Sequence, residues 1–293
     1  MRRFLIIILV VICGWLGVMA FNLLRANSES FLLQHVERRW GRKISAREVR
    51  TTVVPAIGLH LKEFSMADDP VFSKRAFLTA DDIKVTFKVL PLFLYQVRIK
   101  EVIAHGAVIT IIRDPAGVYN FSSLGPENTR RQSRENLQTS QRPARSYSPA
   151  LIPSSLIQIT NGTIHYLDQT NGSNLTVNRV DIKTTDLNRE NSFEFELALA
   201  IFAAEQNLRI RAAVGPLGAD KSLRDLPFDG ELRFDHFDMG KLRAALPVIK
   251  KGLPKALDLR GVYSTQGVRI KGTLNRPSLQ GQVEGTDASF RFD

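Results

Sequence analysis

Apolar and polar residues alternate along much of the chain after residue 44, most regularly at residues 193–201 and 208–214. Successive side chains of a β-strand point to opposite faces of its sheet, so this alternation predicts strands with one buried face. Turn-forming residues separate the runs, for example at residues 114–117 and 170–172. The pattern predicts a mainly β body with a few short helices.

The two most regular runs place their apolar positions on one face, while the other face carries glutamate, arginine and alanine. Such a face suits an open groove that binds lipid acyl chains. It equally suits the closed core of a β-sandwich, and alternation alone does not distinguish the two. The candidate groove residues are Phe193, Phe195, Leu197, Leu199, Ile201, Leu208, Ile210, Ala212 and Val214.

The N-terminal residues 4–24 contain no charged side chain. About twenty helical residues cross a hydrocarbon core of roughly 30 Å. We therefore expect a transmembrane helix that anchors one large exported body, with the N-terminus on the cytoplasmic side. A cleaved secretory signal is the alternative, although its apolar core usually has only ~7–15 residues.

The spacing of apolar residues predicts a further helix at residues 28–40. Four bases in or after it are candidates for contact with lipid headgroups: Arg38, Arg39, Arg42 and Lys43. The alternative is an ordinary helix that caps the end of a sheet with a solvated basic face. Residues 90–95 suggest an apolar turn that covers a sheet edge, and residues 238–251 predict a short helix capped by Asp238.

Composition divides the chain into four parts. Residues 1–25 form the predicted anchor, and residues 26–121 form a first β module with a leading helix. Residues 122–150 are basic and poor in large apolar side chains, so we expect a disordered linker. Residues 151–293 form a second β module, which extends the same architecture and closes on a strand at residues 289–293.

The formal net charge of +11 is spread along the chain. No basic motif is interleaved with aromatic residues, so nucleic acid is not an expected partner, and anionic lipid headgroups fit better. The one cysteine, Cys13, falls in the predicted anchor. Metal-ligand spacings, phosphate loops and nucleophile motifs are missing from the sequence, so we expect no enzyme, cofactor or metal. A catalytic site assembled in space from distant carboxylates is the remaining alternative.

Four segments carry a resemblance to a known family. They are the N-terminal anchor; residues 67–73 with 77–80, 89–92, 97–99 and 113–121; residues 159–168; and residues 272–281 with 287–292. In this order they resemble the AsmA family of Gram-negative envelope proteins. The resemblance implies a periplasmic body fixed in the inner membrane by a single span. It also implies an elongated antiparallel sheet curled into a groove, similar to chorein-type lipid-transfer bridges.

Two functional hypotheses follow. In the first, which the resemblance supports, the body binds or conducts phospholipid acyl chains along the groove during outer-membrane biogenesis. In the second, the body is a scaffold that carries no lipid and binds an outer-membrane assembly protein by strand addition, for instance at residues 289–293.

Overall fold

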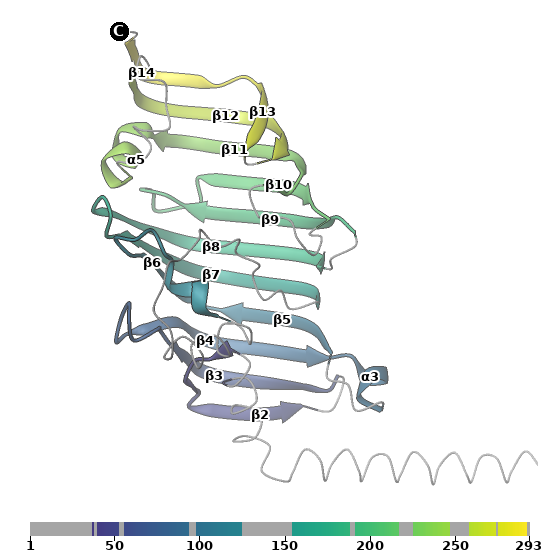
Figure 1. Cartoon of the computed structure of the whole chain (residues 1–293). Helices are drawn as coiled ribbons and strands as arrows, with labels where there is room; N and C mark the ends of the chain where they lie inside the picture. The colour runs from purple at the N-terminus through teal and green to yellow at the C-terminus, as the bar shows by residue number, and fades with distance from the viewer. Residues whose placement is uncertain are drawn as a thin grey trace, which may run out of the picture.

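The computed structural model describes residues 37, 40–52, 56–93, 98–124, 154–187, 191–216, 225–246, 258–273 and 275–291. These residues form one 14-stranded sheet, in which the strands stack into a tall ladder from β2 at one end to β13 and β14 at the other (Figure 1). The strands are β1 (Ile44–Ser45), β2 (Glu48–Thr52), β3 (Gly58–Ala67), β4 (Ala76–Phe87), β5 (Ile99–His105), β6 (Val108–Arg113), β7 (Ser154–Asp168), β8 (Ser173–Leu187), β9 (Phe193–Ala200), β10 (Leu208–Val214), β11 (Phe228–Asp238), β12 (Asp258–Thr273), β13 (Arg276–Gly281) and β14 (Glu284–Arg291).

The predicted strands at residues 193–201 and 208–214 are confirmed as β9 and β10. The sheet is mixed rather than purely antiparallel, which corrects the expectation above. Strands β5 and β6 lie end to end between β4 and β7, and both pair with β7 in parallel. A parallel pairing requires a connection of a dozen residues or more, and residues 114–153 supply that length.

A line of left-handed residues, which we call the crease, crosses the sheet. Register shifts accompany it in several strand pairs, including β7 with β8 and β8 with β9. The backbone at one member is held by a neighbouring side chain, since Gln206 Nε2 donates to the Arg179 carbonyl at 2.9 Å. Bulges of this kind bend a strand. The non-glycine members within strands have φ of 46–52°: Glu63, Asn161, Arg179, His236 and Asp287.

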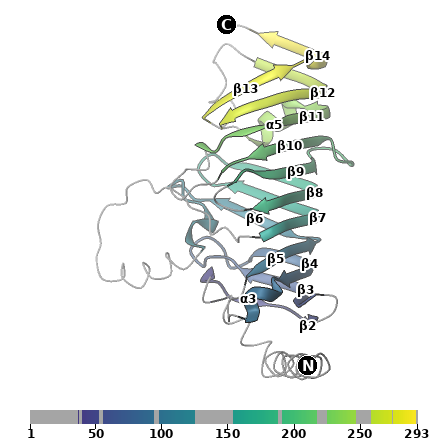
Figure 2. The ribbon, with the colours of Figure 1, turned by 90° about the vertical axis from the view of Figure 1, so that its right-hand side faces the viewer.

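Within the described ranges, the helical segments whose bounds are given are α3 (Val89–Phe93), the 3-10 helix η1 (Asn120–Ser123) and α5 (Met239–Ala245). Helix α5 confirms the predicted helix and its cap, since Asp238 accepts a hydrogen bond from the Lys241 amide at 2.9 Å. It lies against the sheet near β11 and β12 (Figure 1). The turned view shows that the strands are stacked along the long axis of the molecule (Figure 2). Helix α3 occupies the place of the predicted apolar turn.

Several predictions fall on residues outside this description. They are the anchor at residues 4–24, most of the leading helix at residues 28–40, of which only Glu37 and Trp40 are described and both are helical, and the linker from residue 125 to residue 150. Among the described residues, no helix combines the length and the apolar character needed to span a bilayer. Ser122 and Ser123, placed in the predicted linker, belong to η1.

Candidate functional site: an apolar lane across the sheet

One row of apolar side chains runs from strand to strand across the sheet, and we call it the lane. Each member lies directly opposite the next in the strand register, so neighbouring side chains are about 4.5–5.5 Å apart at Cβ. Every member is aliphatic, and the row crosses ten strands without a polar residue. In order from β2 to β12, the lane consists of Val49, Leu61, Ile83, Ala104, Ile159, Ile182, Leu197, Ile210, Leu232 and Val268.

A second row lies two residues away along each strand, on the same face. It is apolar except at Thr184, and it narrows to small residues where Ala212 faces Gly230. A Cβ atom at Gly230 would lie 2.4 Å from that of Ala212, so glycine permits the close approach of β10 and β11 there. From β3 to β13 this row consists of Leu59, Val85, Val102, Ile157, Thr184, Phe195, Ala212, Gly230, Ile270 and Leu279.

The opposite face of the sheet is charged. Between the two apolar rows, the intervening positions alternate in sign from β9 to β12, as Glu196, Arg211, Glu231 and Arg269. Several charges pair on this face, for instance Arg269 with Asp229 at 3.1 Å, and these residues are largely exposed. The charged face therefore remains in water, and the apolar face is the one that needs cover.

The cover of the apolar face differs along the sheet. Near its N-terminal end, Leu61, Ile83 and Ala104 are each 8% exposed, and Trp40 and Leu124 pack on the same core. Between β7 and β11, the lane members Ile159, Ile182, Leu197, Ile210 and Leu232 are only partly buried.

Two segments pack at the margins of the half-buried part of the lane. Helix α5 places Met239 and Leu242 on a cluster that contains Leu199 and Ile201. On the other side, Leu226 packs against Phe193. Phe193 and Leu199 are six residues apart in β9, so these margins are about 20 Å apart at ~3.3 Å per residue.

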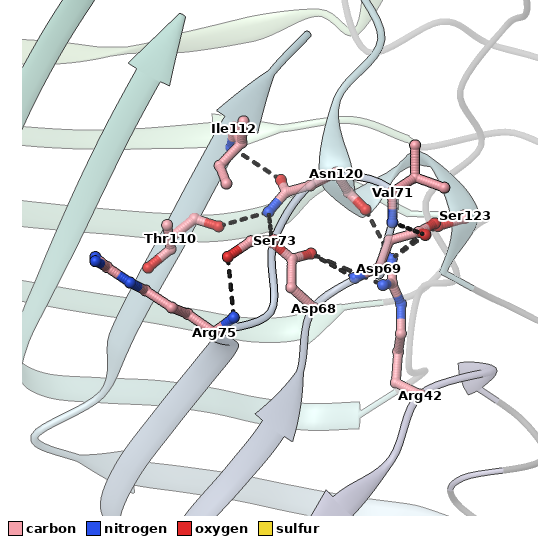
Figure 3. Close-up of polar contacts among 10 residues, drawn as sticks. All are labelled: Arg42, Asp68, Asp69, Val71, Ser73, Arg75, Thr110, Ile112, Asn120 and Ser123. Carbon is pink, nitrogen blue, oxygen red and sulfur yellow. Dashed lines mark hydrogen bonds and ion pairs between the residues drawn. The ribbon is translucent and has the colours of Figure 1, made fainter.

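A buried polar cluster holds the N-terminal end of the sheet together (Figure 3). Asn120 is fully buried, and its Nδ2 donates to Asp68 at 2.9 Å and to the Thr110 carbonyl at 2.8 Å. Its Oδ1 accepts from the Ile112 amide at 3.0 Å. Segments distant in sequence therefore meet at one amide side chain, which uses nearly all of its hydrogen-bonding capacity.

Arg42 belongs to the same cluster. Its Nη2 donates to the Asn120 carbonyl at 2.8 Å and to Ser123 Oγ at 2.7 Å. Its guanidinium also lies 3.7 Å from both Asp68 and Asp69. Arg42 is 6% exposed, so its assignment to headgroup contact is corrected: the side chain bonds within the protein. Lys43 is exposed, and Arg38 and Arg39 lie outside the described residues.

Burial sets the ionisation of this cluster. It lowers the pKa of Arg42, and it raises the pKa of Asp68 despite the hydrogen bond from Asn120 and the charge of Arg42. The cluster is therefore a tightly packed support, and its polar groups bond to one another rather than to a ligand.

A second buried carboxylate fixes the turn between β7 and β8. Asp168 is fully buried and accepts from Arg113 at 3.1 Å and from the Thr170 amide at 2.9 Å. Burial alone would raise its pKa, but bonds from Thr170, Arg113 and Tyr166 outweigh burial and lower it. Burial and the nearby carboxylate raise the pKa of Tyr166 to about 12, so this phenol stays protonated.

The nine predicted groove residues all lie in or next to β9 and β10. Four of them are buried, namely Phe193, Leu199, Ile201 and Ala212, and the other five are partly buried. Leu197 and Ile210 belong to the lane, and Phe195 and Ala212 belong to the second row. The sequence reasoning missed the lane members on other strands, such as Leu61, Ile182 and Leu232. Their alternation was visible, but only the register shows that they lie in one row.

The lane is an apolar surface in its chemistry. Within the described part of the chain, no three His, Cys, Asp or Glu side chains gather in a way that would hold a metal ion. The largest continuous chemical feature is the aliphatic lane itself, bordered by partly buried side chains. Such a surface binds hydrocarbon through area and shape rather than through specific hydrogen bonds.

Comparison with known proteins adds the family. The model of the AsmA family matches residues 3–245, which is most of the chain. Among curated proteins, no sequence matches this chain at a significant level.

Proposed function

The chain belongs to the AsmA family, and membership indicates an envelope-associated protein; on that premise, we propose that it binds phospholipid acyl chains along the lane. In this proposal the predicted N-terminal helix holds the chain in the inner membrane, and the sheet lies in the periplasm. The bound lipid belongs to the traffic that builds the outer membrane.

The observation that carries the proposal is the continuity of the lane. Ten aliphatic side chains face one another across ten strands, although the strands come from all parts of the described sequence. A closed core requires apolar side chains facing each other in layers, whereas the middle of this row is only partly buried. A continuous, half-covered aliphatic row supports a path for hydrocarbon chains.

The energetics favour acyl chains over smaller apolar ligands. Each CH₂ group removed from water contributes ~0.8 kcal/mol, so a long acyl chain gains much more than a small molecule does. The margins provided by α5 and Leu226 add apolar contacts on both sides. The charged groups of the opposite face keep the back of the sheet hydrated.

A pair of neighbouring substitutions tests the proposal. Ile210 is partly buried in the lane, and Arg211 is the next residue on the exposed face. We expect Ile210→Glu to lower the phospholipid bound per full-length chain, because a carboxylate is expensive to bury beside hydrocarbon. Arg211→Glu should retain the wild-type amount. Lipid around the predicted anchor is common to all three proteins, so it does not affect the comparison.

The measurement is lipid phosphate per protein after purification in a mild detergent, with native mass spectrometry to identify the bound species. Ile210→Thr keeps the β-branched shape and should give a smaller loss in the same direction. Circular dichroism checks that each variant is folded. Equal lipid content in folded Ile210→Glu and Arg211→Glu would contradict lipid binding in the lane.

A second candidate function rests on the edge of the sheet. Among the described strands, β13 and β14 pair with β12 alone, so their outer edge is free to accept a strand from another protein. Leu279 is 65% exposed and Val283 is 50% exposed at this edge. A photo-cross-linker at Leu279 that captures one protein, together with unchanged lipid content in Ile210→Glu, would favour a scaffold over a lipid conduit.

A further inference from the structure

Two exposed aliphatic side chains stand at the connection between β4 and β5, outside the lane. Leu90 is 79% exposed and Val89 is 43% exposed, and both belong to α3. The sequence led us to expect that this segment covers a sheet edge, but Leu90 covers no part of the sheet. Leu90 and Val89 are adjacent, so together they form a small exposed apolar surface at the tip of the β4–β5 connection.

Basic residues surround this tip. Lys88 and Arg98 lie together at its base, where the Lys88 amide donates to the Arg98 carbonyl at 2.8 Å. Lys84 and Lys100 are exposed on the strands that lead into and out of the segment. Asp81 and Asp82 lie within three positions of Lys84, and Glu101 is next to Lys100, so the positive charge is concentrated on the bases nearest the tip, Lys88, Arg98 and Lys100. The local charge is therefore positive and complements an anionic surface.

The location of α3 agrees with a membrane surface. It projects beside β2, β3 and β4, which form the end of the sheet nearest in sequence to the predicted anchor (Figure 1). Fourteen residues separate Arg25 from Trp40 and span at most about 50 Å, so both ends of the ~40 Å strand β4 are within reach of the bilayer. An apolar tip with flanking bases is the pattern of segments that insert shallowly into a bilayer interface.

We propose that α3 is a membrane-contact point, at which Leu90 and Val89 insert into the interface of a bilayer containing anionic phospholipid while Lys88 contacts the headgroups. The contact supplements the anchor and fixes the orientation of the sheet on the membrane. It requires no lipid in the lane, so it stands or fails independently of the proposed function.

Val71 provides a matched control, because it is an exposed aliphatic residue at the other end of strand β4. It is 84% exposed and lies in the turn between β3 and β4. Strand β4 has 12 residues, so its two ends are ~40 Å apart. Exposed bases, Lys74 and Arg75, also stand in this turn, so Val71 matches Leu90 in its apolar and basic surroundings and differs in its place on the sheet.

The test uses single-cysteine probes in the full chain. Cys13 is replaced by serine, and an environment-sensitive fluorophore is attached at Leu90→Cys or at Val71→Cys. Each protein is reconstituted into vesicles of phosphatidylcholine with or without phosphatidylglycerol. Lipids that carry spin-label quenchers at known depths report whether the probe touches hydrocarbon.

We expect the probe at position 90 to be quenched at roughly 5–10 Å below the headgroup surface, the depth of interfacial segments. Quenching should increase with phosphatidylglycerol and decrease in Lys88→Glu, while the probe at position 71 stays in water. Two results would overturn the proposal. One is no quenching at position 90, and the other is equal quenching at both positions, which would mean that the sheet lies on the membrane without a specific contact.

Discussion

The lane runs through both halves of the sheet, but its side chains differ in burial between the two halves. In the N-terminal half, Leu61, Ile83 and Ala104 are buried under side chains that include Trp40. From β7 to β11, the lane members of the same row are only partly buried. Both halves have the same alternation in sequence, so the difference comes from the segments that cover the sheet.

The N-terminal half also has a polar cluster that joins distant segments, whereas the buried carboxylate of β7, Asp168, fixes a single turn. Asn120, Arg42 and the two carboxylates Asp68 and Asp69 join three segments into one buried cluster. We interpret the first half as a rigid foundation and the second as a binding surface. The comparison teaches that a row of apolar side chains becomes a core or a ligand surface according to what packs on it.

The largest effect should follow from Asn120→Ala. The substitution leaves the Ile112 amide, the Thr110 carbonyl and Asp68 without their partner, so we expect a loss of about 3–5 kcal/mol in the free energy of unfolding. Asn207→Ala in the β9–β10 turn removes two bonds to Ile201 and should cost only about 1–2 kcal/mol. Urea unfolding of the full chain in detergent measures both. Similar losses would remove the contrast between the halves.

Arg42 and Lys43 separate structural from membrane roles at adjacent positions. Arg42→Ala leaves buried carboxylates without their cation and should destabilise the fold by about 3 kcal/mol. Lys43→Ala changes an exposed side chain and should stay within about 0.5 kcal/mol of the wild type. The emission of Trp40, which packs on the first core, reports unfolding of this end. A stable Arg42→Ala protein would restore the headgroup interpretation of Arg42.

The same residue type can be truncated in each half of the lane. Leu61→Ala opens a cavity in a closed core and should cost about 3 kcal/mol. Leu197→Ala removes a partly buried side chain and should cost about 1 kcal/mol. Guanidinium unfolding curves of the two variants and the wild type give the loss in the free energy of unfolding for each substitution. Equal costs would show that the C-terminal half is packed as tightly as the N-terminal half.

The smallest effect concerns pH and the turn fixed by Asp168. The lowered pKa of this carboxyl means that its ionised form stabilises the fold above its ordinary value of 3.8, and this contribution is lost as the pH falls through the lowered pKa. We expect Asp168→Asn to be less stable than the wild type by about 1 kcal/mol at pH 7. The difference in the free energy of unfolding between the two proteins should decrease below pH 3.8. A difference that is constant from pH 7 to pH 3 would exclude this linkage.

The sequence predicted individual strands and helices better than it predicted which strands pair with one another. Alternation located β9 and β10, and Asp238 marked the start of α5, because both patterns act within one segment. The parallel pairing of β5 and β6 with β7 was missed, since it depends on where a long connection returns. The lane was missed as a row because register is a property of strand pairs.

Three other features of the structure were hard to predict from the sequence: the left-handed residues within strands, the burial of Arg42 and the exposure of Leu90. Asn161, His236 and Asp287 belong to residue types that adopt the left-handed conformation relatively often, but Glu63 and Arg179 rarely adopt it. Arg42 followed a basic run, which suggested solvent exposure, and its acidic partners are 26 and 27 positions away. Exposure of Leu90 was also unexpected, because an apolar residue is predicted to be covered unless the fold shows otherwise.

The central claim is that hydrocarbon chains occupy the apolar face of the C-terminal half, and site-specific photo-cross-linking in growing cells tests it most directly. A photoreactive phenylalanine is placed at Leu197, Ile210 or Leu232 in the lane, and at Glu196 or Arg211 on the opposite face. The account predicts adducts with the mass of a phospholipid at the three lane positions and none at the two charged positions. Adducts at neither set, or equally at both, would contradict it.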